Sequence, residues 1–195
     1  MTPRTALVLA GTLVALLAAS VFFVERQQPR EDPLELHADG IGPLRLGRDY
    51  REAATLALRR NPDTAFVGSG CGGLDEIRYS GRLGALPVGI MAMADEGVLI
   101  EIEAAIEAPL QAESETACLA MRDRLAATFI TRFGPIERTW TVRKPVSREH
   151  MATTGPVVVV ARWFPTGGSC YVSAHYGLGP EESFDQRPGD ALPAQ

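Results

Sequence analysis

The feature that most constrains this chain is an uncharged run of nineteen residues, Ala6–Val24, close to its N-terminus. A helix rises about 1.5 Å per residue, so the run matches the roughly 30 Å hydrocarbon core of a bilayer. Such a run is typical of one membrane-spanning helix or of the core of an export signal. In both cases it directs the rest of the chain to the membrane or beyond it, and this decides how the cysteines are interpreted.

The run leaves two alternatives open. Arg4 before it and the small residues Ala18–Ser20 within it fit a cleaved export signal. Val21–Val24 continue the apolar run past that site, which favours an uncleaved anchor. We therefore expect a signal-anchor over residues 1–24, with a single span in the bacterial inner membrane and the following domain in the periplasm. Secretion into the periplasm after cleavage is the alternative.

Small residues recur within the expected span. Gly11, Ala15 and Ala19 lie four apart and would share one face of the helix. A face of small residues lets another transmembrane helix approach closely. These three residues are therefore candidate contacts for a membrane partner.

Beyond the anchor, a polar linker over residues 25–33 precedes one expected α+β domain over residues 34–176. Residues 177–195 are rich in Pro, Gly and acidic residues without periodicity, so we expect a disordered tail. The formal net charge is −5 at pH 7. A nucleic-acid-binding surface would be basic, and nucleic acid is therefore not expected as a partner.

Two helices are expected from their capping signals. Asp49 can cap the first, with Glu52 three residues on, and Asn61-Pro62 ends it. Ser114 can cap the second and longer helix, and Gly134-Pro135 ends it. Strands follow each helix, which predicts the same order of elements twice.

The clearest hairpin joins Val88–Ala94 to Val98–Ile106. Alternation on its second strand predicts that Val98 and Ile100 face the core with Ile102, and that the glutamates face away. Further strands are expected over Leu74–Tyr79, Ile136–Arg143, Val157–Phe164 and Ser169–Tyr176, and loops over Phe66–Gly73, Ser80–Pro87 and Lys144–Gly155.

These elements give helix, three strands, helix, three strands. Short connections imply antiparallel neighbours. The fold class predicted is α+β, with an N-terminal transmembrane helix followed by two helices packed on one face of a mainly antiparallel sheet.

Several stretches carry a family resemblance. They are GIGPLRLG at residues 40–47, a following helix with REA, a cysteine before a strand, and the hairpin LPVGIMAMADEGVLIEIE at residues 86–103. Together they resemble a group of small exported bacterial proteins without assigned activity. The doubled order of elements is also similar to the β-lactamase-inhibitor-protein-like and SmpA/OmlA-type envelope folds. This chain lacks the lipid-attachment cysteine of the SmpA/OmlA lipoproteins, so the resemblance does not carry their role in outer-membrane assembly over to it.

Three cysteines are present, Cys71, Cys118 and Cys170. In an oxidising envelope they can give one disulfide and one odd thiol. Cys118, near a helix start, and Cys170, on the last strand, both fall on expected inward faces. Their pairing is preferred, Cys71 with Cys118 is the alternative pairing, and Cys71 is the candidate free thiol.

The glycine-rich segment Gly68–Gly73 formally contains GxGxxG. A dinucleotide site needs a strand before that motif and a helix after it, which is not the expected order here. A thiol nucleophile at Cys71 with His150 or His175 as its base is an alternative. No CxxC occurs, and the histidines, His37 among them, lack metal-ligand spacing, so no metal or cofactor is expected.

Trp163 and Tyr171 flank the last expected turn and are candidate aromatic partner contacts. With no convergent catalytic set, the leading hypothesis is a membrane-tethered periplasmic interaction or accessory protein, not an enzyme. One alternative is an exported enzyme inhibitor that inserts Gly68–Gly73 or Ser80–Pro87 into its target. The other is a thiol-dependent enzyme using Cys71.

Overall fold

The computed structural model describes residues 33–70, 73–107 and 110–177. The expected anchor with Gly11, Ala15 and Ala19, nearly all of the linker, Cys71, and the tail beyond Gly177 lie outside the described residues. No helix in the described part of the chain is long and apolar enough to cross a membrane.

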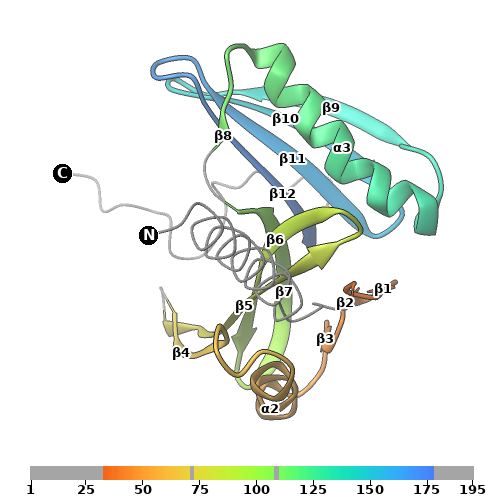
Figure 1. Ribbon diagram of the computed structural model, residues 1–195, viewed down its shortest axis with the longest axis vertical. Helices are drawn as coiled ribbons and strands as arrows, with labels where there is room; N and C mark the ends of the chain where they lie inside the picture. Colours follow the sequence, from red (N-terminus) through yellow and green to blue (C-terminus); the bar gives the residue numbers. More distant parts are fainter. Residues whose placement is uncertain (1–32, 71–72, 108–109, 178–195) are drawn as a thin grey trace, which may run out of the picture. The chain divides into compact units, whose positions relative to one another are not determined.

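A nine-stranded antiparallel sheet is the main element of the domain (Figure 1). Its order is β4-β5-β6-β7-β12-β11-β10-β9, and the short β8 pairs with β12. The two halves of the sheet meet where β7 pairs with β12. The strands are β4 (Phe66–Ser69), β5 (Asp75–Leu83), β6 (Leu86–Asp95), β7 (Val98–Ile106), β8 (Leu110–Gln111), β9 (Arg138–Arg143), β10 (Arg148–Thr154), β11 (Val157–Phe164) and β12 (Ser169–Tyr176).

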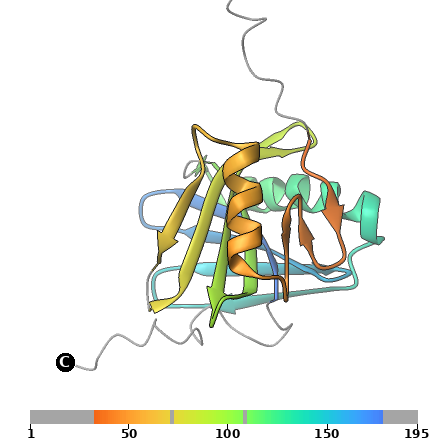
Figure 2. The same ribbon diagram turned by 90° about the horizontal axis from the view of Figure 1, so that it is seen from below.

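The order of elements is repeated, as the sequence predicts. Helix α2 (Tyr50–Arg60) precedes β4–β7, and helix α3 (Glu115–Phe133) precedes β9–β12. Each half places its first strand at an outer edge of the sheet and its last strand at the centre. In Figure 2 the strands of the two halves run in clearly different directions, as the twist of a large sheet requires. The α+β class is confirmed, with four strands in each half where three were predicted.

Helix α2 begins where the sequence predicts. The Asp49 side chain accepts a hydrogen bond from the Glu52 amide at 2.9 Å. The buried residues of α2, namely Ala53, Ala54 and Ala57, are all small, and this lets the helix approach β3, β4 and β5 closely. A three-stranded sheet precedes this helix: β1 (Leu36–His37), β2 (Gly40–Ile41) and β3 (Leu44–Arg45).

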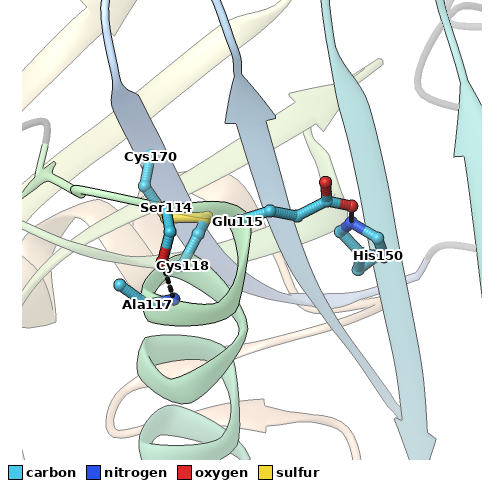
Figure 3. Close-up of a disulfide and its surroundings, with 6 residues drawn as sticks. All are labelled: Ser114, Glu115, Ala117, Cys118, His150 and Cys170. Carbon is cyan, nitrogen blue, oxygen red and sulfur yellow. Dashed lines mark hydrogen bonds and ion pairs between the residues drawn. A yellow bond between two sulfur atoms is a disulfide. The ribbon is translucent and has the colours of Figure 1, made fainter.

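Helix α3 is capped by Ser114, which accepts a hydrogen bond from the Ala117 amide at 3.2 Å. It packs on β10, β11 and β12 through a larger apolar face that includes Leu125 and Phe129. The predicted disulfide between Cys118 and Cys170 is present, with a Cα–Cα distance of 5.6 Å (Figure 3). It joins the first turn of α3 to the centre of the sheet.

Both helices pack on the same face of the sheet, here called the helix face. A row of register partners on it, Ile77, Ala92, Ile102 and Tyr176, crosses four strands and both halves. All four are fully buried in one core that also contains residues of both helices. The opposite face, here called the open face, is covered by no described helix and by none of β1–β3.

Three predicted loops are largely strands. β4 occupies part of Phe66–Gly73, and β10 occupies most of Lys144–Gly155. Ser80–Pro87 is the tight β5–β6 hairpin, whose turn is only Gly84-Ala85. Glycine-rich and charged stretches have low strand propensity, and here pairing with neighbouring strands outweighs that propensity.

The predicted alternation on β7 is wrong at its start. A β-bulge between Met93 and Ala94 shifts the register of β6 against β7. As a result Leu99 is buried at 1% exposure, whereas Ile100 is 45% exposed. One extra residue in a strand reverses which side chains face the core, and single-strand periodicity does not reveal it.

Candidate functional site on the open face of the sheet

A continuous row of side chains crosses the open face at the seam between the two halves. Arg78, Met91, Glu103, His175 and Val158 are successive register partners on β5, β6, β7, β12 and β11. Side chains directly opposite each other in a sheet are in contact range on one face. The open face therefore combines ionisable and apolar groups across both halves.

His175 is the centre of a polar cluster on this face. Its side chain is 0% exposed, and its Nδ1 atom lies 3.3 Å from Oε1 of Glu101. Its Nε2 atom lies 2.7 Å from the Ser173 hydroxyl and 3.8 Å from Oε1 of Glu103. Hydroxyl, imidazole and carboxylate thus occur in the order that hydrolytic triads use.

The surroundings of this cluster do not suit acyl transfer. Ser173 lies inside a central strand, so its backbone amide belongs to the sheet ladder and does not point to a substrate. The Glu103 carboxylate places negative charge close to where an oxyanion would form, and catalysis needs hydrogen-bond donors there. His175 itself is fully buried. The arrangement instead ties β12 to β7 across the seam.

A second ionic cluster lies on the open face of the C-terminal half. Glu149 is fully buried, and its Oε1 atom accepts hydrogen bonds from Lys144 Nζ at 3.0 Å and Arg162 Nε at 2.7 Å. No residue in the described part of the chain forms a hydrogen bond with its Oε2 atom. Two cations share one carboxylate oxygen at this point of the face. A buried polar atom left unpaired costs about 1–3 kcal/mol.

Beside this ionic cluster lies an apolar group, here called the open-face apolar cluster. The guanidinium of Arg138 stands over the Trp140 ring, 5.2 Å from its centroid, at the margin of the group. Met151 is only 2% exposed although it lies on the face that no described helix covers. The cluster consists of Trp140, Val142, Met151, Val158 and Val160.

His150 is engaged on the helix face. Its Nε2 atom lies 2.7 Å from Oε1 of Glu115, and its Nδ1 atom lies 2.9 Å from the Thr141 hydroxyl (Figure 3 shows the Glu115 contact). Arg148 forms an ion pair with the other Glu115 oxygen. Burial raises the pKa of Glu115, but hydrogen bonds from Arg148 and His150 outweigh it and lower that pKa below its usual value. The group holds the start of α3 against β10.

Trp163 and Tyr171, the predicted aromatic contacts, lie on opposite faces. Trp163 is 7% exposed within the core under α3. Tyr171 is 51% exposed on the open face and makes an edge contact with Phe164, with 5.7 Å between ring centroids. They do not form one patch, and Tyr171 is the aromatic residue available to a partner.

The described neighbours of Cys71 bear on the thiol hypothesis. Gly70 follows β4 at one edge of the sheet, whereas His175 and His150 lie on strands four and six positions away. At about 4.8 Å per strand these are distances of roughly 19 and 29 Å along the sheet. Neither histidine lies beside the edge at which Gly70 ends, which disfavours a thiol–imidazole pair. Cys71 itself lies outside the described residues.

A small cleft of about 250 Å³ lies between the β2–β3 hairpin and α2. Its charges are balanced, because Arg45 pairs with Asp39 and the cleft contains both Arg48 and Glu52. Small-molecule sites usually measure about 300–1,000 Å³. No group of metal-ligating side chains occurs among the described residues. The cleft is lined by Gly42, Pro43, Arg45, Arg48, Glu52, Ala53 and Leu56.

Comparison of the chain with protein-family models, curated proteins and solved structures finds no match. The open face is therefore the feature of this protein that bears most on its function. Sequence reasoning did not find its two ionic clusters. Alternation already places His175 on the outward side of the last strand and Glu101 on the outward side of its hairpin. The missing fact was that these two strands are neighbours.

Proposed function

We propose that this protein is a membrane-tethered periplasmic accessory protein that binds another protein through the open face of its sheet. The run Ala6–Val24 anchors it in the bacterial inner membrane, as a single span. The observation that carries the proposal is the open face itself. Two helices pack on the other face of this large sheet, whereas no described helix covers this one, which leaves it for a partner.

The chemistry of the face supports protein contact. Interfaces are enriched in aromatic residues, methionine and arginine, and the energetically dominant contacts are often aromatic or arginine side chains. Tyr171 is half exposed there, and Met91 and Arg78 lie in the same face. Paired charges such as Glu149 with Arg162 supply orientation and specificity rather than bulk affinity.

The disulfide supports the periplasmic part of the proposal. Stable disulfides persist in oxidising compartments and are rare in the cytosol of mesophiles. Cys118 and Cys170 are both fully buried, so this bond is structural in character. The disulfide lies beneath α3, where it forms as the domain folds, and this is consistent with a domain that folds after export.

The alternatives gain less support. For an inhibitor, a long inserting loop is expected, but Ser80–Pro87 is a hairpin with a turn of two residues, Gly84-Ala85. For a thiol enzyme, a base beside the Gly70 edge is needed, and His150 and His175 lie elsewhere in the sheet. Neither alternative has an observation that favours it over protein binding.

Site-specific photocrosslinking in native membranes tests the proposal. A benzophenone amino acid replaces Tyr171 on the open face or, as the control, Leu58 on α2, which is similarly exposed at 43%. We expect one discrete protein adduct from position 171 and none from position 58. Tyr171→Glu should then reduce recovery of that same partner after mild detergent extraction. Equal adducts at both positions, or none at 171 with the chain intact in the membrane, would contradict the proposal.

A further inference from the structure

We propose that β9, the outer strand of the C-terminal half, binds an extended acidic segment of another protein by antiparallel strand addition. The inference deepens the proposed function and rests on it for the existence of a partner, because it names the part of the partner that is bound. Strand pairing and charge at this edge carry the contact itself, and a peptide probe tests it without the partner.

The two edges of the large sheet differ. β9 lies at one edge and β4 at the other, and no further strand pairs with either in the described part of the chain (Figure 1). β4 has only four residues, and a short edge strand is one means by which proteins avoid pairing with other chains. β9 has six residues, RTWTVR, all in regular register with β10 and without proline or lysine. Its Thr, Trp and Val residues favour the strand conformation, so β9 is a preformed template for a further strand.

The hydrogen bond that closes the β9–β10 hairpin shows which backbone groups of β9 point outward. The Lys144 amide donates to the Ser147 carbonyl at 2.9 Å. Hydrogen-bonded pairs alternate along an antiparallel ladder, so the amides and carbonyls of the even-numbered residues of β9 point to β10. Those of Thr139, Thr141 and Arg143 therefore point away from the sheet. A line of outward donors and acceptors is what strand addition uses.

Charge at the two ends of β9 selects an acidic partner. Arg138 and Arg143 are both exposed, and neither forms an ion pair with a carboxylate in the described part of the chain. Arg138 instead stands over the Trp140 ring. Glu137, the nearest acid in the sequence, precedes the strand and pairs with neither arginine among the described residues. Because opposite charges stabilise a strand pair and like charges destabilise it, carboxylates are the favoured groups opposite these two cations.

The same charges disfavour a second copy of this chain as the added strand. When two copies of β9 pair antiparallel, outward groups meet outward groups only if even-numbered residues lie opposite even-numbered residues. Arg138 of one copy would then face an even-numbered residue of the other. The even-numbered residues from Ile136 to Val146 include no acid. A different protein, with acids at the matching positions, is therefore the better occupant.

Pairing also defines the sequence that the partner segment should have. Trp140 and Val142 are half-buried and belong to the open-face apolar cluster, so apolar residues opposite them would extend that cluster. Carboxylates opposite Arg138 and Arg143 would meet the two cations. In antiparallel order, the segment reads acid, apolar, polar, apolar, polar, acid. Backbone hydrogen bonds then supply affinity, and the side chains supply specificity.

A synthetic hexapeptide of sequence EVTVTE, capped at both ends, is the probe for this edge. The full chain in mild detergent is titrated with it, and amide hydrogen exchange is followed residue by residue. We expect exchange at Thr141 and Arg143 to slow about tenfold when nine-tenths of the edge is occupied, because their outward amides then have acceptors. Trp140 is the internal reference and should keep its rate, since its amide already pairs with β10.

Methylation of the peptide nitrogens separates strand addition from simple attraction between charges. N-methyl groups at the third and fifth residues remove the amides that face β9, and protection should then be lost. N-methyl groups at the second and fourth residues point away from β9, and protection should remain. The basic peptide KVTVTK should bind about tenfold more weakly than EVTVTE, and the chain variant R138E/R143E should reverse this preference.

A pair of variants at Thr139 tests the edge from the side of the protein. Thr139→Pro removes one outward amide, and proline is tolerated in an edge strand at such a position. Thr139→Val retains the amide. We expect peptide binding to be lost in the first variant and kept in the second.

Two results with the unsubstituted chain overturn the proposal. One is equal protection by the two N-methylated peptides, or no protection by EVTVTE. The other is slower exchange at Thr141 as the chain concentration rises without peptide, which assigns the edge to a second copy.

The two proposals fail separately. If EVTVTE leaves exchange at Thr141 unchanged but Tyr171 still crosslinks to a partner, the edge contact is wrong and the proposed function stands. If the peptide protects Thr141 and no partner crosslinks at Tyr171, the proposed function is wrong and the edge contact stands.

Discussion

His150 on β10 and Glu115 in the first turn of α3 are joined by a contact of 2.7 Å between Nε2 and Oε1. Cys118 lies in the same turn of the helix, where it is bonded to Cys170 on β12. The start of α3 is thus fixed to two different strands, once by charge and once covalently. Substitutions at the N-terminal end of α3 therefore measure how much each of these two attachments contributes to the stability of the C-terminal half.

Glu115→Gln should lower the free energy of unfolding by about 1 kcal/mol at neutral pH, since it weakens the contacts to Arg148 and His150 and the favourable charge at the helix start. The pKa of Glu115 is lowered in the folded state, so its contribution is present above about pH 4.3 and is lost as pH falls further. Urea unfolding as a function of pH measures both effects. The matched control is the exposed Glu113→Gln, and an equal loss there would contradict the assignment.

Replacing both disulfide cysteines, Cys118→Ala with Cys170→Ala, should destabilise the domain by up to about 4 kcal/mol. The sequence separation of 52 sets this value, because closing a loop of that length removes entropy from the unfolded chain. Urea titrations of the oxidised and substituted chains provide the measurement. Cys71→Ser is the control, and it should leave the transition unchanged. A large shift with Cys71→Ser would mean that Cys71 takes part in a bond of its own.

Tyr176→Phe and Tyr79→Phe should each leave stability unchanged or raise it by about 1 kcal/mol. Both phenol hydroxyls are buried and have no hydrogen-bond partner among the described residues, and removing an unsatisfied polar atom removes its desolvation cost. Thermal unfolding of the single variants tests this expectation. Tyr171→Phe on the open face is the exposed control. Destabilisation by more than about 1 kcal/mol would show that each hydroxyl has a partner, such as a buried water.

The free energy of unfolding should decrease steadily with pH under alkaline conditions. Burial raises the pKa of Tyr79 and Tyr176, and the negative charge of Asp39 adds to the effect at Tyr176. The unfolded chain loses these protons near pH 10 while the folded chain keeps them, so stability is intact below pH 10 and falls above it. Each tyrosine should contribute about 1.4 kcal/mol per pH unit. In denaturant titrations between pH 9 and 12, the slope in Tyr176→Phe should be smaller than that of the parent chain by about 1.4 kcal/mol per pH unit, and an unaltered slope would refute the attribution.

The parts of the fold that the sequence predicts are those with strong local signals. Asp49 and Ser114 cap helices at the expected residues, because capping is a contact over three positions. The Cys118–Cys170 bond follows from inward-facing positions on a helix and a strand. These features need little information about distant neighbours.

The parts that were missed depend on pairing between strands. β10 contains Arg148, Glu149 and His150, a poor strand sequence by propensity, yet both of its edges are paired. The bulge that buries Leu99 is a property of β6 and β7 together. The polar cluster around His175 was missed for the same reason. Glu101 and His175 are 74 residues apart, and they meet only because β7 and β12 are neighbours.

The seam between β7 and β12 has a consequence for how the domain is assembled. β7 is the fourth strand of the first half, but its partner is the last described strand of the chain. Until β12 arrives, the first half has a bare edge with unpaired amides and carbonyls, the kind of edge that recruits other chains. Contacts so distant in sequence also form slowly. A chaperone that shields this edge would be of most use to the protein in that interval.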